Sequence, residues 1–440
     1  MTNVPLVFYY LASANRRLHW NVKKLRRFQD KRLRQVVKYA YDSVPFYHQY
    51  FKEAGMDPND VKGVEDLSKL PIVNKDFFRR QVPQKIVSKE FNRNKLKKVR
   101  TSGSSGKPFE IFITEREDAW RKAIYMRANM SCGQRSRDRW VVLTSPHHFH
   151  DTTNLQKRLG IFSQTCISLF ESTEEKINQI AAGKPDVLDG YSQSLFLLSK
   201  EIKRIGLETI TPRIMFGSAE LIHPKSRRFM EKVFGAPFCD QFGAAEVDRS
   251  AWQCLEREGY HMDVDSVITE FVDKDGNSVA DGESGEIVFT SLFNFAMPFI
   301  RYAIGDVGAP SDDSCSCWRN LPLMKVVEGR KDSFLKLPGN RVVSPMVFNF
   351  AMSSFKYYSA IDQYYIRQKK IDFFEVALKM VDDSFVERDM TSDFESHFKK
   401  FFNMGEDELK FEVSVVDEIP LSPTGKLLSV SSDLKSVDGM

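Results

Sequence analysis

The sequence predicts an α/β fold with a large, multi-layer N-terminal domain and a small α+β C-terminal domain. In the centre of the chain, strand-like runs such as residues 140–143 and 213–216 alternate with helix-like stretches, which is typical of helices layered on a sheet. From residue 263 onward the pattern changes to short alternating segments joined by polar turns, which indicates antiparallel strands.

The individual elements can be placed in chain order. Residues 15–60 are predicted to be helical, with turns at 44–45 and 55–58, where Pro and Gly interrupt the pattern. Two strands, 267–272 and 285–290, are predicted to pair across the polar turn that follows the first of them. The C-terminal part is predicted to contain a strand at 373–381, a helix at 389–402 and a strand at 410–416. We place the domain boundary after residue 331, which gives domains 1–331 and 332–440.

Composition indicates a cytoplasmic globular protein of enzyme size. The 440 residues are 42% hydrophobic, which is enough to build the cores of two or three domains. The net charge of +5 is small for this length, so we expect no nucleic-acid partner. Six unevenly spaced cysteines do not indicate a disulfide scaffold, and the apolar stretch 4–12 is too short to span a bilayer.

Basic residues are concentrated near the N-terminus. Between Arg16 and Lys38 the chain has ten Lys and Arg residues and one acid, Asp30, with hydrophobic residues between them. The favoured interpretation is the solvated basic face of an amphipathic helix. Weak contact with a membrane surface is the alternative.

A Ser/Gly-rich run at 101–107 is predicted to bind phosphate. Glycines let backbone N–H groups approach an anion closely, hydroxyls add donors, and a lysine adds charge. The run differs from a Walker A loop in its spacing and in the Pro108 that follows. A flexible linker is the alternative, but the strand-like segment 109–113 suggests that the loop is anchored on a sheet edge. The predicted loop residues are Thr101, Ser102, Gly103, Ser104, Ser105, Gly106 and Lys107.

Four further segments make the interpretation of this loop as a phosphate-binding loop more specific: 241–246, 301–306, 329–332 and 420–426. In this order and spacing they resemble the adenylate-forming superfamily of acyl-CoA synthetases and adenylation domains. The resemblance is closest to its phenylacetate-CoA ligase and capsule-biosynthesis (CapK-like) branch, and it runs from residue 44 to the C-terminus.

The resemblance implies ATP and Mg²⁺ as cofactors and a role for each motif. The loop 101–107 would hold the β- and γ-phosphates, and Glu246 would bind Mg²⁺, a hard cation that prefers carboxylate oxygen. Asp306 would accept the ribose hydroxyls, and Arg330 would lie near ribose and phosphate. The aromatic Phe242 would stack on adenine, although the family usually has Tyr there. The remaining nucleotide-binding residues by resemblance are Gln241 and Gly243, together with Ser218, Ala219 and Glu220 of the adenine-side loop.

The resemblance also implies a mobile C-terminal domain. Lys426 would enter the active site during adenylation and stabilise the charge that develops at the α-phosphorus. Asp332 occupies the position of the family's hinge. The implied reaction forms acyl-AMP and pyrophosphate, after which a thiol, expected to be CoA, displaces AMP. ATP supplies the activation, so no side-chain nucleophile is required.

Two further groups of residues are candidates for the acyl pocket and for a structural metal. Tyr191, His147 and His148 lie in segments that resemble the family's acyl-pocket walls, although aromatic residues also fill cores. Three thiols and one imidazole form a candidate structural Zn²⁺ site, and some members of the branch have Cys and His at similar positions. These residues are Cys254, His261, Cys315 and Cys317.

Two other functions remain open from the residues. An adenylating enzyme could pass the acyl group to an amine or a sugar, or transfer AMP to a cofactor. A non-catalytic nucleotide-binding or membrane-associated scaffold is suggested by the basic N-terminal helix and by departures such as Phe242 and Ile304. The presence of all four functional residues argues against it: Lys426, Glu246, Asp306 and Arg330.

Overall fold

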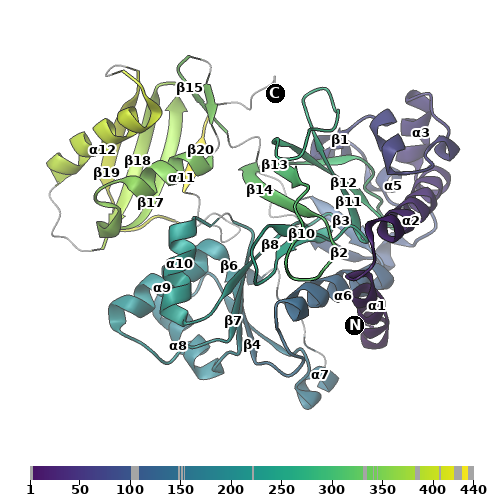
Figure 1. Cartoon of the computed structure of the whole chain (residues 1–440), viewed down its shortest axis with the longest axis horizontal. Coiled ribbons are helices and arrows are strands. Elements are labelled where there is room, and N and C mark those ends of the chain that lie inside the picture. Colours follow the sequence, from purple (N-terminus) through teal and green to yellow (C-terminus); the bar gives the residue numbers. More distant parts are fainter. Residues whose placement is uncertain are drawn as a thin grey trace. The chain divides into compact units, whose positions relative to one another are not determined.

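The structure is a computed structural model of the chain, and its described residues form two compact units (Figure 1). It describes all residues except 1–2, 101–108, 147–148, 150–151, 153, 221, 331–333, 340, 344, 382–386, 406–407, 421–428 and 435–440. Unit 1 consists of Met1–Asp138, Asp151–Ser163 and Cys239–Val327. Unit 2 consists of Arg139–His150, Gln164–Phe238 and Glu328–Met440. The predicted α/β class is confirmed, whereas the boundary at 331/332 lies outside the described residues and stays a prediction.

Unit 1 begins with helices whose ends match local capping signals. The Asn3 side chain accepts a hydrogen bond from Leu6 N at the start of one helix, and the Asn21 side chain does the same for Lys24 N in the next. Thr114 and Glu117 form a reciprocal capping box at the start of a third. The helices are α1 (Val4–Arg17), α2 (Val22–Ser43), α3 (Pro45–Glu53), α4 (Lys75–Arg79), α5 (Pro83–Ile86), α6 (Glu115–Ser131) and α7 (Asn154–Leu159). The predicted helical region 15–60 is therefore largely correct, and α1 begins well before it.

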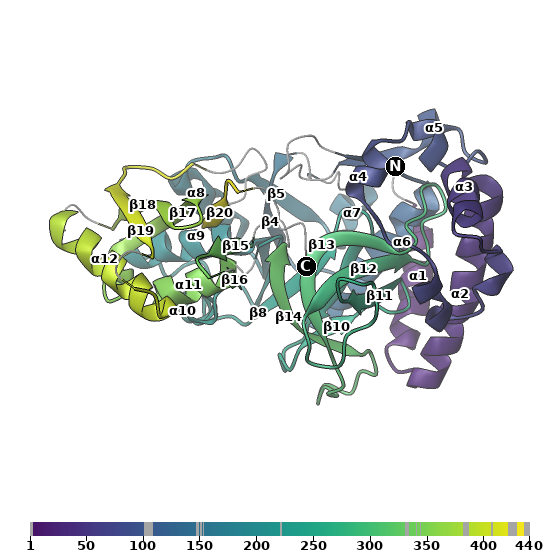
Figure 2. The same cartoon turned by 90° about the horizontal axis from the view of Figure 1, so that it is seen from above.

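The sheet of unit 1 has the strand order β11-β12-β13-β14-β10-β9-β8. Its strands are β8 (Phe238–Ala244), β9 (Asp248–Gln253), β10 (Tyr260–Met262), β11 (Val267–Val272), β12 (Gly285–Ser291), β13 (Tyr302–Ser311) and β14 (Leu323–Arg330). The predicted pairing of the segments 267–272 and 285–290 is confirmed as the antiparallel pair β11–β12. A short strand, β1 (Val73–Asn74), pairs with β13 in parallel. Helix α3 packs against α2 and α5 (Figures 1 and 2).

Two strands of unit 1 flank the predicted phosphate loop. They are β2 (Lys97–Arg100) and β3 (Glu110–Ile113), which pair antiparallel with Arg100 opposite Glu110. The loop itself lies outside the described residues, but its two ends are joined by a two-stranded sheet.

Unit 2 contains a parallel sheet and a separate four-stranded sheet. The parallel sheet has the order β7-β6-β4-β5, formed by β4 (Trp140–Thr144), β5 (Gln164–Ser168), β6 (Val187–Tyr191) and β7 (Ile214–Ser218). One face of this sheet is covered by α8 (Thr173–Gly183), α9 (Ser192–Ile205) and α10 (Pro224–Phe234) (Figure 1). This alternation of strand and helix is the pattern that the central sequence predicts.

The C-terminal part of unit 2 has its own sheet and hydrophobic core. The sheet order is β19-β18-β17-β20, with β17 (Ile361–Lys370), β18 (Phe373–Met380), β19 (Lys410–Val415) and β20 (Val430–Ser432). Helices α11 (Pro345–Ser354) and α12 (Glu387–Phe402) and the hairpin β15 (Leu335–Leu337) and β16 (Arg341–Val343) accompany it. Phe348, Phe374, Phe394 and Phe398 are fully buried in its core. The predicted strand, helix and strand of this region are confirmed.

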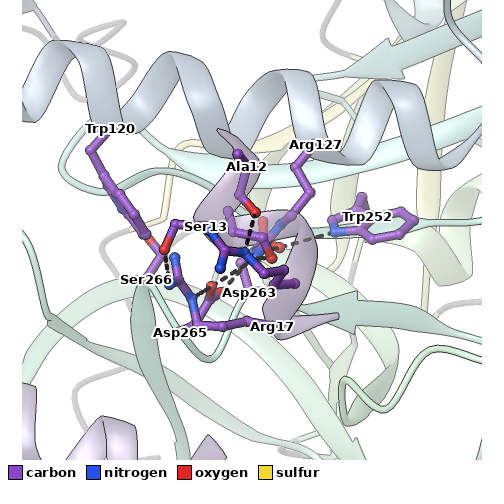
Figure 3. Close-up of polar contacts among 11 residues, drawn as sticks. Ala12, Ser13, Arg17, Trp120, Arg127, Trp252, Asp263, Asp265 and Ser266 are labelled. Atoms are coloured by element: carbon purple, nitrogen blue, oxygen red, sulfur yellow. Dashed lines mark hydrogen bonds and ion pairs between the residues drawn. The ribbon is translucent and has the colours of Figure 1, made fainter. Parts of the chain in front are cut away.

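A buried ionic network joins α1, α6 and the segment after β10 in unit 1 (Figure 3). Arg127 bonds Asp263 at 2.5 Å and Asp265 at 2.8 Å, and Arg17 bonds Asp265 at 2.6 Å. Trp252 Nε1 donates to Asp263 Oδ1 over 3.0 Å. Burial alone would raise the pKa of Asp265, but the two arginines outweigh it and hold the pKa low. These charges compensate one another in an environment without solvent, so the network fixes three distant segments together.

In the part of the chain that the structure describes, every helix is too short or too polar to cross a bilayer.

Candidate nucleotide-binding residues and a candidate metal centre

Glu246, the predicted Mg²⁺ ligand, is held by three side chains in the turn between β8 and β9. Tyr302 of β13 donates its hydroxyl to Glu246 Oε1 over 2.9 Å. The carbonyl oxygen of Glu246 accepts hydrogen bonds from Arg121 Nη2 and Asn294 Nδ2, each at 2.7 Å. Glu246 is 6% exposed, so both its backbone and one carboxylate oxygen are fixed in a nearly enclosed position. A carboxylate fixed in this way suits a metal ligand because little side-chain entropy is lost on binding.

The three residues that bond Glu246 were not predictable as its neighbours: Arg121, Asn294 and Tyr302. Each is separated from Glu246 by dozens of residues or more, and a single sequence carries no signal for such distant contacts. Tyr302 lies inside one of the quoted motif segments, so only its partner was unknown.

Strand β8 carries the predicted residues Gln241, Phe242 and Gly243. The Gln241 side chain is buried and donates to Asn129 Oδ1 over 2.7 Å, so its hydrogen bond lies in the interior of unit 1. The half-buried Phe242 ring lies with its centroid 6.4 Å from that of Phe289. A Cβ atom at Gly243 would lie 2.2 Å from Asp248 O, so the close pairing with β9 requires glycine. Of the three residues, Phe242 has the aromatic face that adenine stacking needs.

Asp306, the predicted ribose ligand, lies on β13 four residues beyond Tyr302, a separation of roughly 13 Å along a strand. It is half-buried. Arg301, which begins the same motif segment, pairs with Glu270 at 3.1 Å and donates to Leu70 O over 2.6 Å. Arg301 therefore anchors the start of the strand, and Asp306 is the motif residue suited to a ligand.

In unit 2 the predicted adenine-side and acyl-pocket residues lie at the carboxyl ends of neighbouring parallel strands. Tyr191 ends β6 and is in register with Ser218, which ends β7. Ala219 adopts a left-handed conformation with φ 69°, and Glu220 accepts a hydrogen bond from Gln193 N over 3.1 Å. Burial raises the pKa of Tyr191, so its hydroxyl stays protonated. The carboxyl ends of parallel strands are a common place for ligand sites in α/β sheets.

The remaining predicted residues fall outside the description. The loop Thr101–Lys107, His147, His148, Asp332 and Lys426 are among the undescribed residues. Arg330 ends β14, and its side chain is not described. Their roles stay predictions.

The four predicted zinc ligands of unit 1 do come together. Cys254 follows β9, His261 lies in β10, and Cys315 and Cys317 lie in the segment between β13 and β14. All four ligand atoms lie within 4.8 Å of one another. Cys254 Sγ is 3.5 Å from Cys315 Sγ, and Cys317 Sγ is 3.2 Å from His261 Nε2. Three thiols and one imidazole at these distances match a closed tetrahedral Zn²⁺ site.

The pKa shifts in this cluster differ from one donor to another. Burial lowers the pKa of His261 to about 4, with Arg319 acting in the same direction, so the imidazole is neutral and its nitrogen can bind a metal. Burial would raise the pKa of Cys317, but hydrogen bonds from Arg319 outweigh it and lower the pKa. Burial raises the pKa of the other two thiols, Cys254 and Cys315, so the imidazole and the Cys317 thiol are the donors whose pKa shifts favour metal binding.

Comparisons with known proteins agree with the resemblance seen in the motifs. No model of a protein family matches the chain. The phenylacetate-coenzyme A ligase of Thermus thermophilus is 27% identical over 336 residues, which is 74% of each chain. Protein CapK of Staphylococcus aureus is 23% identical over 437 residues, 92% of this chain and 89% of CapK. Among solved structures, 2-hydroxyisobutyryl-CoA ligase in the postadenylation state superposes with a TM-score of 0.78 over 95% of this chain and 91% of that one, at 18% identity. The expected resemblance in sequence and fold is confirmed.

Proposed function

We infer that this chain, a relative of the phenylacetate-CoA ligases and CapK with the fold of an adenylate-forming CoA ligase, activates a carboxylic acid with ATP and passes the acyl group to CoA. A carboxylate oxygen attacks the α-phosphorus and pyrophosphate leaves, which yields acyl-AMP. The thiol of CoA then attacks the acyl carbon, loses its proton and releases AMP. The observation that carries this inference is the ordered motif set on this fold, with Glu246 held by Tyr302, Arg121 and Asn294.

In this reaction the described residues have distinct proposed roles. Glu246 would hold Mg²⁺, which when bound neutralises charge on the phosphates. Asp306 would accept the ribose hydroxyls, and Phe242 would cover one face of adenine. Backbone groups of 218–220 would contact the base edge.

The undescribed motif residues complete the proposal. The loop 101–107 and Arg330 would bind phosphate, and Lys426 would stabilise the charge at the α-phosphorus. Asp332 would act as the hinge about which residues 332–440 reorient between the two half-reactions.

We propose an aryl or arylacetyl acid as the substrate class. Tyr191 lies at the carboxyl end of β6, opposite Ser218 of β7, and this position supports an aromatic wall there. His147 and His148 belong to the same proposed pocket.

We also propose a structural Zn²⁺ at Cys254, His261, Cys315 and Cys317, and a cytoplasmic location. The zinc would tie the end of β9 to β10 and to the segment before β14, with no role in the chemistry. The cytoplasmic location is supported by the cysteines, which are all free thiols.

The zinc proposal is tested by treating the protein with a strong chelator. We expect release of about one Zn²⁺ per chain and a lower melting temperature. The Cys317→Ser variant should lose the metal, whereas Cys166→Ser, which lies outside the cluster, should retain it. A wild-type chain that holds no zinc, and whose melting temperature the chelator does not change, would contradict this proposal.

The function is tested by pyrophosphate release from Mg-ATP with a panel of aryl, fatty, hydroxy and amino acids, with and without CoA. We expect release with one acid class, and an acyl-CoA product when CoA is present. Lys426→Ala should reduce acyl-AMP formation by at least a hundredfold, and Lys410→Ala, an exposed lysine of β19, should not. Release without thioester would favour an amine, a sugar or AMP transfer, and no release with any acid would favour a scaffold.

A further inference from the structure

Helix α2 carries a stripe of exposed cations that the proposed chemistry does not use. The cationic stripe consists of Lys23, Arg27, Lys31, Arg34 and Lys38. Their spacings of four and three residues place them on one helix face, within an arc of about 80° and along roughly 22 Å. Within the described part of the chain, none of the five pairs with a carboxylate; Arg34 donates to the backbone oxygen of Lys62.

Three other arginines of the basic segment have structural roles, whereas the exposed Arg16 donates to Ala12 O of its own helix. Arg17 joins the buried network through Asp265. Arg32 donates to Leu292 O over 2.8 Å and lies 4.2 Å over the Phe293 ring. Arg26 pairs with Asp30 at 3.4 Å and with Glu65. The fold therefore explains these three and, through the bond to Lys62 O, one member of the stripe, Arg34. It does not explain the four other cations of the stripe, whose like charges repel and weaken the helix.

Helix α1 presents an apolar face to solvent directly before this stripe. Its inner face, with Val7 and Leu11, packs on α6. Its exposed residues include Pro5, Phe8, Tyr9 and Ala12, with Phe8 44% and Tyr9 68% exposed. Val22, at the start of α2, is 71% exposed. Solvent-exposed aromatic and aliphatic residues followed by a row of cations are the composition of helices that lie in a membrane interface.

We propose that α1 and α2 dock this protein onto a bilayer rich in anionic lipid. The cationic stripe would meet phosphate headgroups, and Phe8, Tyr9 and Val22 would enter the boundary between headgroups and acyl chains. A single-stranded nucleic acid would also meet the cations, but the aliphatic Pro5, Ala12 and Val22 offer it nothing. Charge and apolar exposure together therefore favour lipid.

The test is cosedimentation of the full-length protein with vesicles of phosphatidylcholine alone or with 30% phosphatidylglycerol. Each cation near an anionic surface strengthens binding roughly fivefold, so Lys23→Glu/Arg27→Glu/Lys31→Glu should weaken binding at least about a hundredfold. The matched control is Arg135→Glu/Arg137→Glu/Lys274→Glu, three exposed cations of unit 1 outside α2, with the same change in net charge. Phe8→Ser/Tyr9→Ser should weaken the binding that remains at high salt, where the electrostatic part is screened.

The outcomes separate the alternatives. Binding to anionic vesicles that the stripe variant loses and the control variant keeps supports the proposal. Equal binding to both vesicle types, equal losses in both charge variants, or tighter binding to an oligonucleotide than to anionic vesicles overturns it. A stable dimer in light scattering that Phe8→Ser/Tyr9→Ser dissolves would assign the apolar face to a second copy and would also overturn it. Pyrophosphate release should be unchanged in all three variants, so failure of this proposal leaves the proposed reaction intact.

Discussion

At the scale of single residues, the hydroxyl of Tyr302 is the contact whose removal is most informative. Tyr302→Phe keeps the buried ring but removes the 2.9 Å hydrogen bond to Glu246 Oε1. Hydrogen bonds to charged groups contribute about 1.5–3 kcal/mol, so the Mg²⁺ concentration for half-maximal pyrophosphate release should rise about tenfold or more. Activity at saturating Mg²⁺ should recover much of its wild-type value.

Tyr47→Phe is the matched control for that variant. The Tyr47 hydroxyl is also fully buried, but it bonds Pro298 O and Ile300 N. Its loss should lower stability without changing the Mg²⁺ dependence. Equal shifts in both variants would mean that Tyr302 supports the fold and has no specific effect on Glu246.

Gly243 is the second residue whose substitution has a specific expected effect. Gly243→Ala would place Cβ 2.2 Å from Asp248 O and must displace the β8–β9 turn that carries Glu246. We expect a loss of at least about 2 kcal/mol in unfolding free energy and a loss of ATP binding, measured by denaturation and calorimetry. Gly405→Ala, whose Cβ would meet its nearest neighbour at 3.5 Å, should change neither. A stable, ATP-binding Gly243→Ala chain would show that the turn tolerates movement.

The sequence predicted some of the site residues but not their neighbours. The zinc-site residues were predictable because thiols and imidazole are the usual protein ligands of Zn²⁺. They are Cys254, His261, Cys315 and Cys317. The partners of Glu246 were not, since Arg121 and Asn294 bond its backbone oxygen from distant segments. Gln241 matched a motif by position, but its side chain is directed at Asn129.

At the scale of elements, the buried ionic network determines how firmly α1 and α6 are attached. Arg127→Met would leave Asp263 and Asp265 buried with less compensation, so we expect a loss of about 3–5 kcal/mol in chemical denaturation. Arg139→Met removes an ion pair with Asp186 in which the arginine is 57% exposed, and it should cost at most about 1 kcal/mol. Similar losses in the two variants would contradict a special contribution from burial.

The elements themselves were largely predictable. The hairpin β11–β12 follows from alternation and a polar turn, and α12 from helical periodicity. Helix α1 was missed because its first nine residues, 4–12, are all apolar and show no helical alternation, and its cap, Asn3, is a single residue. The order of the strands in the sheet of unit 1 was not predictable, because β10 pairs not only with its neighbour in the chain, β9, but also with the distant β14.

At the scale of the whole molecule, the C-terminal region should fold alone. Its core residues, among them Phe348, Phe374, Phe394 and Phe411, all come from the segment 335–430. A fragment of residues 334–440 should therefore unfold cooperatively with urea, as followed by circular dichroism. A fragment without a cooperative transition would mean that this region depends on the remainder of unit 2, and it would weaken the proposed hinge at Asp332.

The pairing of β2 with β3 has a consequence for the entropy of ATP binding. Because Arg100 lies opposite Glu110, residues 101–109 are the connection of a hairpin whose ends are already joined in the free protein. The loop-closure entropy is therefore lost during folding and not when phosphate binds. Since closure costs only about 0.6 kcal/mol more for each doubling of length, affinity should respond to the hydroxyls, glycines and lysine of this loop far more than to its length.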